Sequence, residues 1–167
     1  MRRPSALFAV FMLTACGGSD PSTGESPGNF VPPATRPPTP LPGQVQSTPL
    51  SNYVGHYPND AVDGVGFFDR SEVANLVVDL VPEEGLRRTI VGREATTVPI
   101  ARVGSRIAAH GCEAHNCADR NWTVLVAADG NLDGGSVCYH DAESMGDASR
   151  WSTRAGTERR PGTCPQN

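Results

Sequence analysis

This chain of 167 residues has no lysine, few aromatic residues and no apolar run long enough to cross a bilayer. All 14 basic residues are arginine, and 18 acidic residues outnumber them. An acidic chain is poorly suited to bind nucleic acid, whose phosphates attract basic surfaces. Its field favours a cationic partner instead. Its apolar run at residues 6–13 is far shorter than the roughly 20 residues of a transmembrane helix.

Familiar catalytic motifs are also missing. The chain contains no Gly-x-Ser-x-Gly, no phosphate-binding loop and no His-Glu-x-x-His. Asp60, Asp63 and Asp69 surround the glycines of segment 64–66, but acids beside turns are ordinarily solvated caps. We therefore expect no catalytic residues and no cofactor, and we predict that the protein is not an enzyme.

The N-terminal residues match an export signal. Arg2 and Arg3 form a positive region, residues 6–13 form an apolar region, and Leu13-Thr14-Ala15-Cys16 matches the lipobox of bacterial lipoproteins. The alternatives are an ordinary secretory signal and a short uncleaved anchor. We predict a signal peptide over residues 1–15 and lipidation of Cys16. Gly17 follows, where Asp would favour retention in the inner membrane, so we expect an anchor in the outer membrane facing the periplasm.

Residues 16–52 have the composition of a tether. Between residues 17 and 52, 23 of 36 positions are Gly, Pro, Ser or Thr, which leaves little to bury. Six prolines between residues 32 and 42 favour an extended polyproline conformation. Residues 53–167 are predicted to form one domain. Loss of Arg2 and Arg3 with the signal leaves 12 arginines against 18 acids, a formal charge of −6.

Periodicity within the domain predicts an α+β fold. Residues 69–72 read as an Asp-x-x-Glu capping box, and apolar residues then recur at helical spacing, so we expect a helix over residues 70–81. Residues 86–91 add a possible second helical turn. From residue 97 the period changes to two, which is typical of strands. We expect about five antiparallel strands with the one N-terminal amphipathic helix packed on them. The expected strands cover residues 98–103, 106–110, 122–128, 136–141 and 150–155.

Five cysteines leave four for disulfides once Cys16 carries a lipid. Four cysteines in an oxidising envelope imply two bridges with three possible pairings. We expect Cys112–Cys117, which closes a small ring, and Cys138–Cys164, which pins the Pro/Gly-rich tail to the core. The competing interpretation is a metal site built from Cys112, His115 and Cys117, with His110 as a further ligand. The chain lacks the second ligand pair that zinc sites usually have, so we predict no metal.

Two further segments suggest chemistry but are explained more simply. Residues 129–134 match the first half of an EF-hand loop, yet the twelfth position is His140 rather than Glu, and strands flank the segment. A tight turn explains the same residues. A reactive thiol at Cys112 or Cys117 is also disfavoured, because the ring is two residues wider than Cys-x-x-Cys and has no βαβ context.

The stretch from residue 53 to about residue 151 resembles the family of periplasmic inhibitors of vertebrate (C-type) lysozyme. The signature of that family is a Cys-x-x-His-x-Cys loop, usually Cys-Lys-Pro-His-Asp-Cys, followed by a strand. Here the loop is Cys112-Glu113-Ala114-His115-Asn116-Cys117, and Asn121-Trp122-Thr123-Val124-Leu125-Val126 is the strand that follows. Glu113 and Ala114 replace Lys and Pro, and Asn116 replaces Asp. The lipid tether also differs from the soluble founding member.

The resemblance implies a function for the loop. In the family, the loop is closed by a disulfide and enters the active-site cleft of lysozyme. His115 would be the inserted imidazole, with Cys112 and Cys117 as its clamp and a C-type lysozyme as the protein partner. Lysozyme cleaves through one protonated and one ionised carboxyl group, and an imidazole between them could bond both. The alternative is a structural, metal or redox module in which Cys112–Cys117 only staples a hairpin.

Overall fold

The computed structural model describes residues 48–166. The predicted signal peptide at residues 1–15, the predicted lipidation of Cys16 and most of the predicted tether lie outside this range. Between residues 48 and 166, no helix is both long and apolar enough to cross a membrane.

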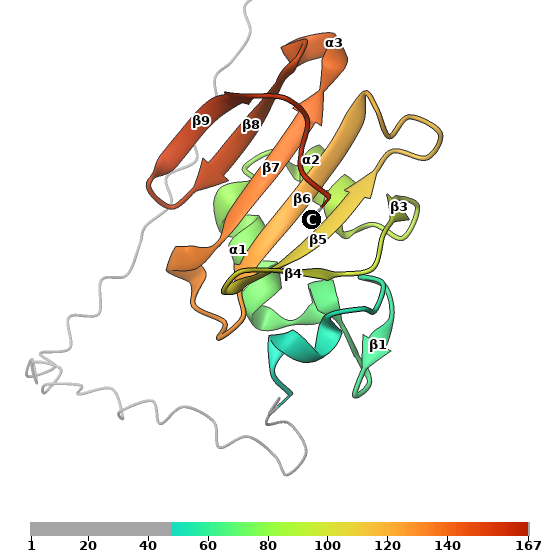
Figure 1. The fold of residues 1–167 in the computed structure, drawn as a ribbon, viewed down its shortest axis with the longest axis vertical. Coiled ribbons are helices and arrows are strands. Elements are labelled where there is room, and N and C mark those ends of the chain that lie inside the picture. The colour runs from blue at the N-terminus through green and yellow to red at the C-terminus, as the bar shows by residue number, and fades with distance from the viewer. Residues whose placement is uncertain (1–47, 167) are drawn as a thin grey trace, which may run out of the picture. The chain divides into compact units, whose positions relative to one another are not determined.

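Seven strands form one antiparallel sheet with short connections (Figure 1). β3 and β4 both pair with β5 at one edge, and β6, β7, β8 and β9 follow in order to the other edge. Strands that are neighbours in sequence are therefore neighbours in space, which short turns can connect. The strands are β3 Thr96–Thr97, β4 Ala101–Val103, β5 Arg106–Cys112, β6 Arg120–Ala127, β7 Ser136–Asp141, β8 Ala148–Thr153 and β9 Gly156–Pro161.

The first edge of the sheet is one strand that a proline interrupts. Pro99 has no N–H and cannot donate to the ladder, and the chain leaves β5 between β3 and β4. There the Ile100 N–H donates to the His56 carbonyl, and the Ile100 carbonyl accepts from the Gly55 N–H, both at 2.8 Å. The segment before β1 thus satisfies the backbone groups that the break leaves free.

Three short helices, a small hairpin and three 3₁₀ turns accompany the sheet in the described chain. α1 and α2 lie behind the sheet in the view of Figure 1, and α3 is a single turn between β7 and β8. β1 and β2 pair only with each other. These elements are α1 Ser71–Leu80, α2 Glu84–Val91, α3 Ala142–Met145, β1 Ala61–Val62, β2 Val65–Gly66 and the turns Leu50–Tyr53, Phe67–Asp69 and Leu132–Gly134.

One face of the sheet carries the hydrophobic core. The buried residues of α1 recur at helical spacing, as expected of an amphipathic helix. Trp122, Val124 and Val126 alternate along β6 and belong to the same buried cluster. Tyr53 and Phe67 extend this cluster in an edge-to-face pair with ring centroids 5.5 Å apart. The α1 residues are Val73, Leu76, Val77 and Leu80.

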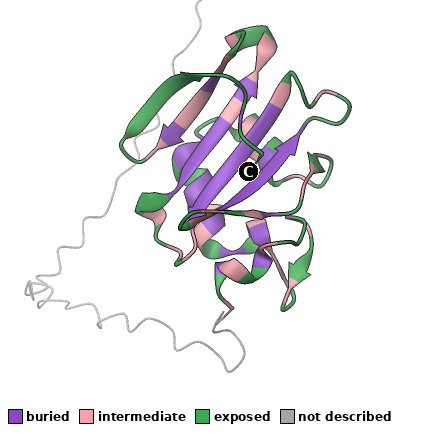
Figure 2. Cartoon of the chain, in the orientation of Figure 1, coloured by how far each residue is buried: buried purple, intermediate pink, exposed green. Residues whose placement is uncertain are grey.

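The other face of the sheet is also buried, although many of its side chains are polar. Figure 2 shows buried residues along β5, β6 and β7, and Thr123 of β6 is fully buried. Residues 162–166, which we call the C-terminal strap, cross in front of this face (Figure 1). Cys164 of the strap is bonded to Cys138, and the Thr123 hydroxyl donates to the Pro165 carbonyl at 2.5 Å. The strap covers this face where the helices cover the first.

The fold class expected from the sequence is wrong in two respects. The main sheet has seven strands rather than about five, and a separate two-stranded sheet is present. Three short helices occur in the described chain instead of one N-terminal helix. β9 shows why the sequence misled: its six residues are all exposed, so it has no apolar alternation, and its ladder to β8 holds it. The domain is dominated by its sheet.

The helix predicted over residues 70–81 is present as α1, but the predicted Asp69-x-x-Glu72 capping box does not form. Arg70 is the N-cap residue and its side chain caps no helix N–H. Its buried guanidinium instead pairs with Glu72 at 2.8 Å and donates to the Thr48 carbonyl at 2.6 Å. The hydrogen bond from Arg70 lowers the pKa of the Glu72 carboxyl. This pair fastens the start of the described chain to α1.

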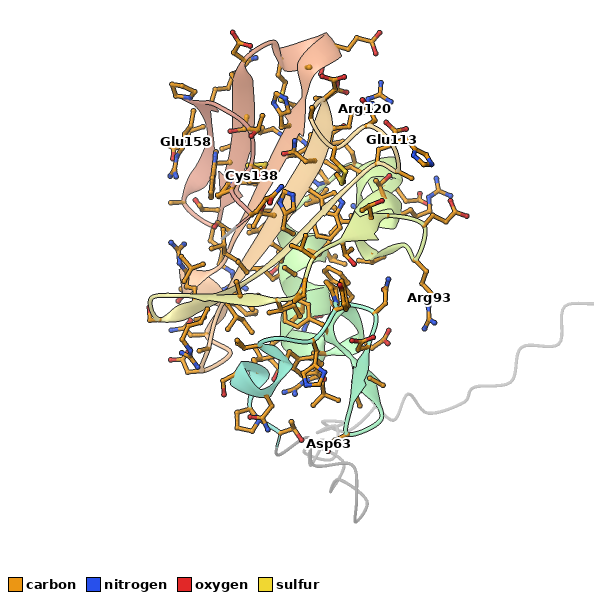
Figure 3. The ribbon with its side chains drawn as sticks, turned by 45° about the vertical axis from the view of Figure 1, so that its right-hand side comes forward. Asp63, Arg93, Glu113, Arg120, Cys138 and Glu158 are labelled. Atoms are coloured by element: carbon orange, nitrogen blue, oxygen red, sulfur yellow. A yellow bond between two sulfur atoms is a disulfide. The ribbon has the colours of Figure 1, made fainter. Side chains whose placement is uncertain are left out.

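The described chain begins at one end of the sheet, and the β5–β6 turn lies at the other. Thr48 bonds to Asp63, and Figure 3 places Asp63 and Glu113 at opposite ends of the domain. Leu50 is already buried at 2 % exposure, so packing begins ahead of residue 53, the expected start of the domain.

Candidate functional site

The Cys-x-x-His-x-Cys segment forms the turn between β5 and β6, and we call residues 112–117 the disulfide loop. Cys112 ends β5 and is paired in register with Asn121 of β6. Its disulfide to Cys117 closes the loop with the two Cα atoms 4.8 Å apart. Cys112 is buried and Cys117 is exposed. The loop is therefore rooted in the sheet and projects into solvent. Both expected disulfides are present, the second being Cys138–Cys164.

Backbone hydrogen bonds hold the loop in a single turn. The Glu113 N–H donates to the Arg120 carbonyl at 3.0 Å, which extends the β5–β6 ladder by one step. The N–H groups of Asn116 and Arg120 donate to the carbonyls of Glu113 and Asn116, each at 2.9 Å. These bonds satisfy backbone groups that a loose loop would leave to water, so the disulfide is not the only constraint on its shape.

His115 occupies the tip of the loop in a left-handed conformation. Its φ is +64°, and the only other non-glycine residue with positive φ between residues 48 and 166 is Asp63. This conformation costs a residue with a Cβ about 1 kcal/mol, which the surrounding turn must offset. The side chain is exposed and has no hydrogen bond or ion pair with any other described residue. The imidazole is thus presented to solvent rather than used within the fold.

Acidic groups surround one arginine at the base of the loop. The Arg120 guanidinium lies 3.7 Å from Asp141, 3.4 Å from Glu113 and 3.0 Å from Glu143. Asp141, followed by Glu113, raises the pKa of the Arg120 guanidinium. Figure 3 shows Glu113 and Arg120 close together at this end of the sheet. Asp119 adds a fourth carboxylate nearby, and it is exposed, as Glu113 and Glu143 are, so carboxylates outnumber the single guanidinium of this cluster.

The loop borders two open hollows. One, of about 680 Å³, lies between the loop and the connection from α2 to β3, and the other, of about 390 Å³, lies beside α3. A partner with a cleft could receive the projecting loop, and the edges of that cleft could lie in the two hollows beside it. The larger hollow is lined by Arg88, Thr89, Gly92, Arg93, Glu94, Ala95, Glu113 and Ala114.

The residues weighed as metal ligands do not converge. Cys112 and Cys117 are bonded to each other, and His110 sits within β5 with its Nδ1 2.9 Å from the Thr123 hydroxyl. Among residues 48–166, no group of three or more His, Cys, Asp or Glu side chains is placed to hold a metal ion.

The remaining acidic segments take part in turns. In residues 129–134, the Asp129 carboxylate accepts from the Asn131 N–H and Asn131 accepts from the Asp133 N–H. Asp133 also pairs with Arg154 at 3.0 Å. The EF-hand-like sequence therefore forms a turn closed by its own side chains, in line with the simpler interpretation.

Sequence reasoning missed the polar residues that support the loop. Arg120 and Asn121 begin β6, two positions ahead of the strand expected from residue 122. Asn121 is 3 % exposed and bonds to both the loop and the C-terminal strap. Its place four positions after Cys117 and directly before the expected strand is the signal that could have drawn attention to it.

Comparison with known proteins adds no assignment: no family model, no curated protein and no solved structure matches this chain.

Proposed function

We propose that this domain inhibits a C-type lysozyme by placing the disulfide loop in the active-site cleft, with His115 between the two catalytic carboxyl groups. The observation that carries the proposal is the imidazole of His115, exposed at the tip of a covalently closed loop and without a hydrogen-bond or ion-pair partner among residues 48–166. The disulfide and the backbone hydrogen bonds hold the loop that carries this group, so its backbone loses little conformational entropy on binding and more of the contact energy remains as affinity.

The chemistry of an imidazole suits this target. A neutral histidine has one N–H donor and one acceptor nitrogen. Lysozyme keeps one catalytic carboxyl protonated and the other ionised, so the ring can accept from the first and donate to the second. Both catalytic groups are then occupied and the loop fills the space of the sugar. The protein acts by binding without turnover.

The charge around the loop also supports a cationic protein partner. Asp119 and Glu143 lie exposed beside the loop, and their field attracts positive charge on an approaching surface. Glu113 replaces a lysine of the family pattern and would bring a negative charge toward an acidic cleft. Arg120, 3.4 Å from Glu113, offsets that charge.

Stoichiometric inhibition by matched histidine variants tests the proposal. The purified domain is titrated against hen-type lysozyme digesting cell walls. His115→Ala should raise the inhibition constant at least about 100-fold, because two hydrogen bonds to carboxyl groups are each worth about 1.5–3 kcal/mol. His56→Ala, which removes another exposed histidine, should inhibit like the parent. Thermal stability should stay constant in both.

Two results would contradict the proposal. If the parent neither inhibits nor binds at micromolar concentration, C-type lysozyme is not the target. Should His115→Ala inhibit as well as the parent, the imidazole is a bystander and the disulfide only staples the hairpin.

The place of action belongs to the same proposal. The pattern of residues 1–16 supports a lipoprotein anchored in the outer membrane, where the domain would face lysozyme entering the periplasm. Cys16→Ala should move the protein from the membrane fraction to the soluble fraction or leave it unprocessed, as read on blots after fractionation. If the variant stays with the membrane as the parent does, the lipobox interpretation is wrong.

A further inference from the structure

Asn121 lies beneath the disulfide loop and joins it to a distant part of the chain. Its Nδ2 donates to the Cys117 carbonyl at 2.9 Å, and its Oδ1 accepts from the Cys164 N–H at 3.0 Å. The residue is also paired in register with Cys112. The buried side chain of Asn121 therefore bonds both to Cys117 at the end of the loop and to Cys164 of the C-terminal strap. It also lies opposite Cys112, where the loop begins.

The orientation of this carboxamide follows from its partners. A carbonyl can only accept and a backbone N–H can only donate, so the amide nitrogen must face Cys117 and the oxygen must face Cys164. The side chain has no other arrangement that makes both bonds. At 3 % exposure, losing either bond would leave a buried polar group without a partner.

The strap holds the far side of this link. Cys164 is bonded by its disulfide to Cys138, which is fully buried. The carbonyl of Pro165 accepts a hydrogen bond from the Thr123 hydroxyl. The backbone N–H of Cys164 therefore donates to the Asn121 side chain from a constrained position. The side-chain amide of Asn121 in turn donates to the loop at the Cys117 carbonyl.

We propose that Asn121 is a positioning residue for the disulfide loop, and that the C-terminal strap acts through it to hold His115 in place. The consequence for inhibition rests on the proposed function, whereas the order of the loop can be measured without any lysozyme. Failure of one can thus be told from failure of the other.

Asn121→Asp is the sharpest variant, because it changes one hydrogen bond and almost no volume. The ionised carboxylate still accepts from the Cys164 N–H but opposes the Cys117 carbonyl. A protonated carboxyl regains a donor for that carbonyl, and burial raises the pKa of such a group. Lowering the pH from about 7.5 to about 5 should therefore repair the variant.

Loop order is read from NMR relaxation and amide exchange of residues 113–117. At about pH 7.5 the variant should show a more mobile loop than the parent, and inhibition about tenfold weaker, as expected for one buried hydrogen bond. Both differences should shrink toward the parent as the pH falls. Each value is taken as a ratio to the parent at the same pH, because His115, His110, Glu113 and the neighbouring His140 face this region in both proteins.

Ser152→Ala is the matched control. It removes a buried hydroxyl from β8, where Ser152 bonds to Thr157 of β9, and it touches neither the loop nor the strap. It should leave loop order and its pH dependence unchanged. The double variant Cys138→Ser, Cys164→Ser should loosen the loop although neither residue belongs to it.

The parent provides a second measurement in case Asn121→Asp does not fold. Its Asn121 side-chain amide protons should exchange far more slowly than those of Asn116, which donate to Glu113 at the surface. Equal exchange rates, an ordered loop in Asn121→Asp at about pH 7.5, or disorder that persists at about pH 5 would each overturn the positioning role. An unchanged loop in the double cysteine variant would overturn the part played by the strap.

Discussion

The two disulfides of this domain close two different kinds of segment. Cys112–Cys117 joins residues five apart in sequence and forms a projection whose outer cysteine is exposed. Cys138–Cys164 joins residues 26 apart, and both of its cysteines are buried. The first disulfide shapes the exposed loop between β5 and β6, and the second attaches the C-terminal strap to the sheet. The contrast teaches that a cross-link that shapes an exposed loop and a cross-link that fastens a buried segment can be separated within one small domain.

Removing the strap disulfide should cause the largest loss of stability. Cross-linking residues 26 apart is worth about 3.5 kcal/mol of unfolding free energy in the chain-entropy model. Cys138→Ser with Cys164→Ser should lower the urea midpoint accordingly and expose the polar face beneath the strap. Equilibrium urea unfolding monitored by Trp fluorescence measures this. A midpoint equal to that of the parent would show that the strap stays in place without its covalent bond.

Removing the loop disulfide should lower the free energy of unfolding less than removing the strap disulfide does, and should weaken the proposed inhibition more. The same model gives about 2 kcal/mol for cysteines five apart. Cys112→Ser with Cys117→Ser should also weaken inhibition, because the loop loses part of its preorganisation before it meets lysozyme. Urea unfolding and the inhibition assay are run on the same preparation. The contrast between the two disulfides breaks down if this variant loses stability but inhibits like the parent.

Mild acid should lower the stability of the domain through a histidine beneath the strap. Burial lowers the pKa of His110, whose Nδ1 contacts Thr123 beneath the strap. The unfolded chain therefore binds a proton more readily than the folded one. The free energy of unfolding is therefore unaffected by His110 above its unfolded pKa of about 6.5. It decreases as the pH falls below that value, because protonation then favours the unfolded chain.

Thermal unfolding across this range measures the effect, and His110→Asn is its control because it keeps a donor but cannot titrate. The parent should lose stability between about pH 6.5 and the lowered pKa of His110, and the variant should not. The carboxyls of Glu72 and Glu83, whose pKa values are lowered by hydrogen bonds from Arg70 and Arg150, act only below the ordinary value of 4.5. Equal slopes for parent and variant would remove His110 from this account.

The sequence predicted those parts of the fold whose residues must alternate. Helix α1 buries one side of its periodic pattern, and β6 directs Trp122, Val124 and Val126 to the core at alternate positions, so their residues reveal them. The small ring at Cys112–Cys117 and its projecting histidine were equally readable, because spacing alone confines such a short loop.

The remaining elements depend on contacts that no local pattern encodes. β9 is exposed at every position and exists because β8 offers it a ladder. The break at Pro99 is stabilised by Gly55 and His56, far away in sequence. Asn121 joins the loop to Cys164, which lies 43 positions along the chain. A polar residue that links distant segments becomes visible only once the chain has folded.

The opposite placement of Thr48 and the disulfide loop gives the domain a direction. The eight residues of β6 alone span about 26 Å, and this strand begins beside the loop. A protein fused ahead of residue 48 would therefore join the domain away from the loop and should leave the loop unobstructed.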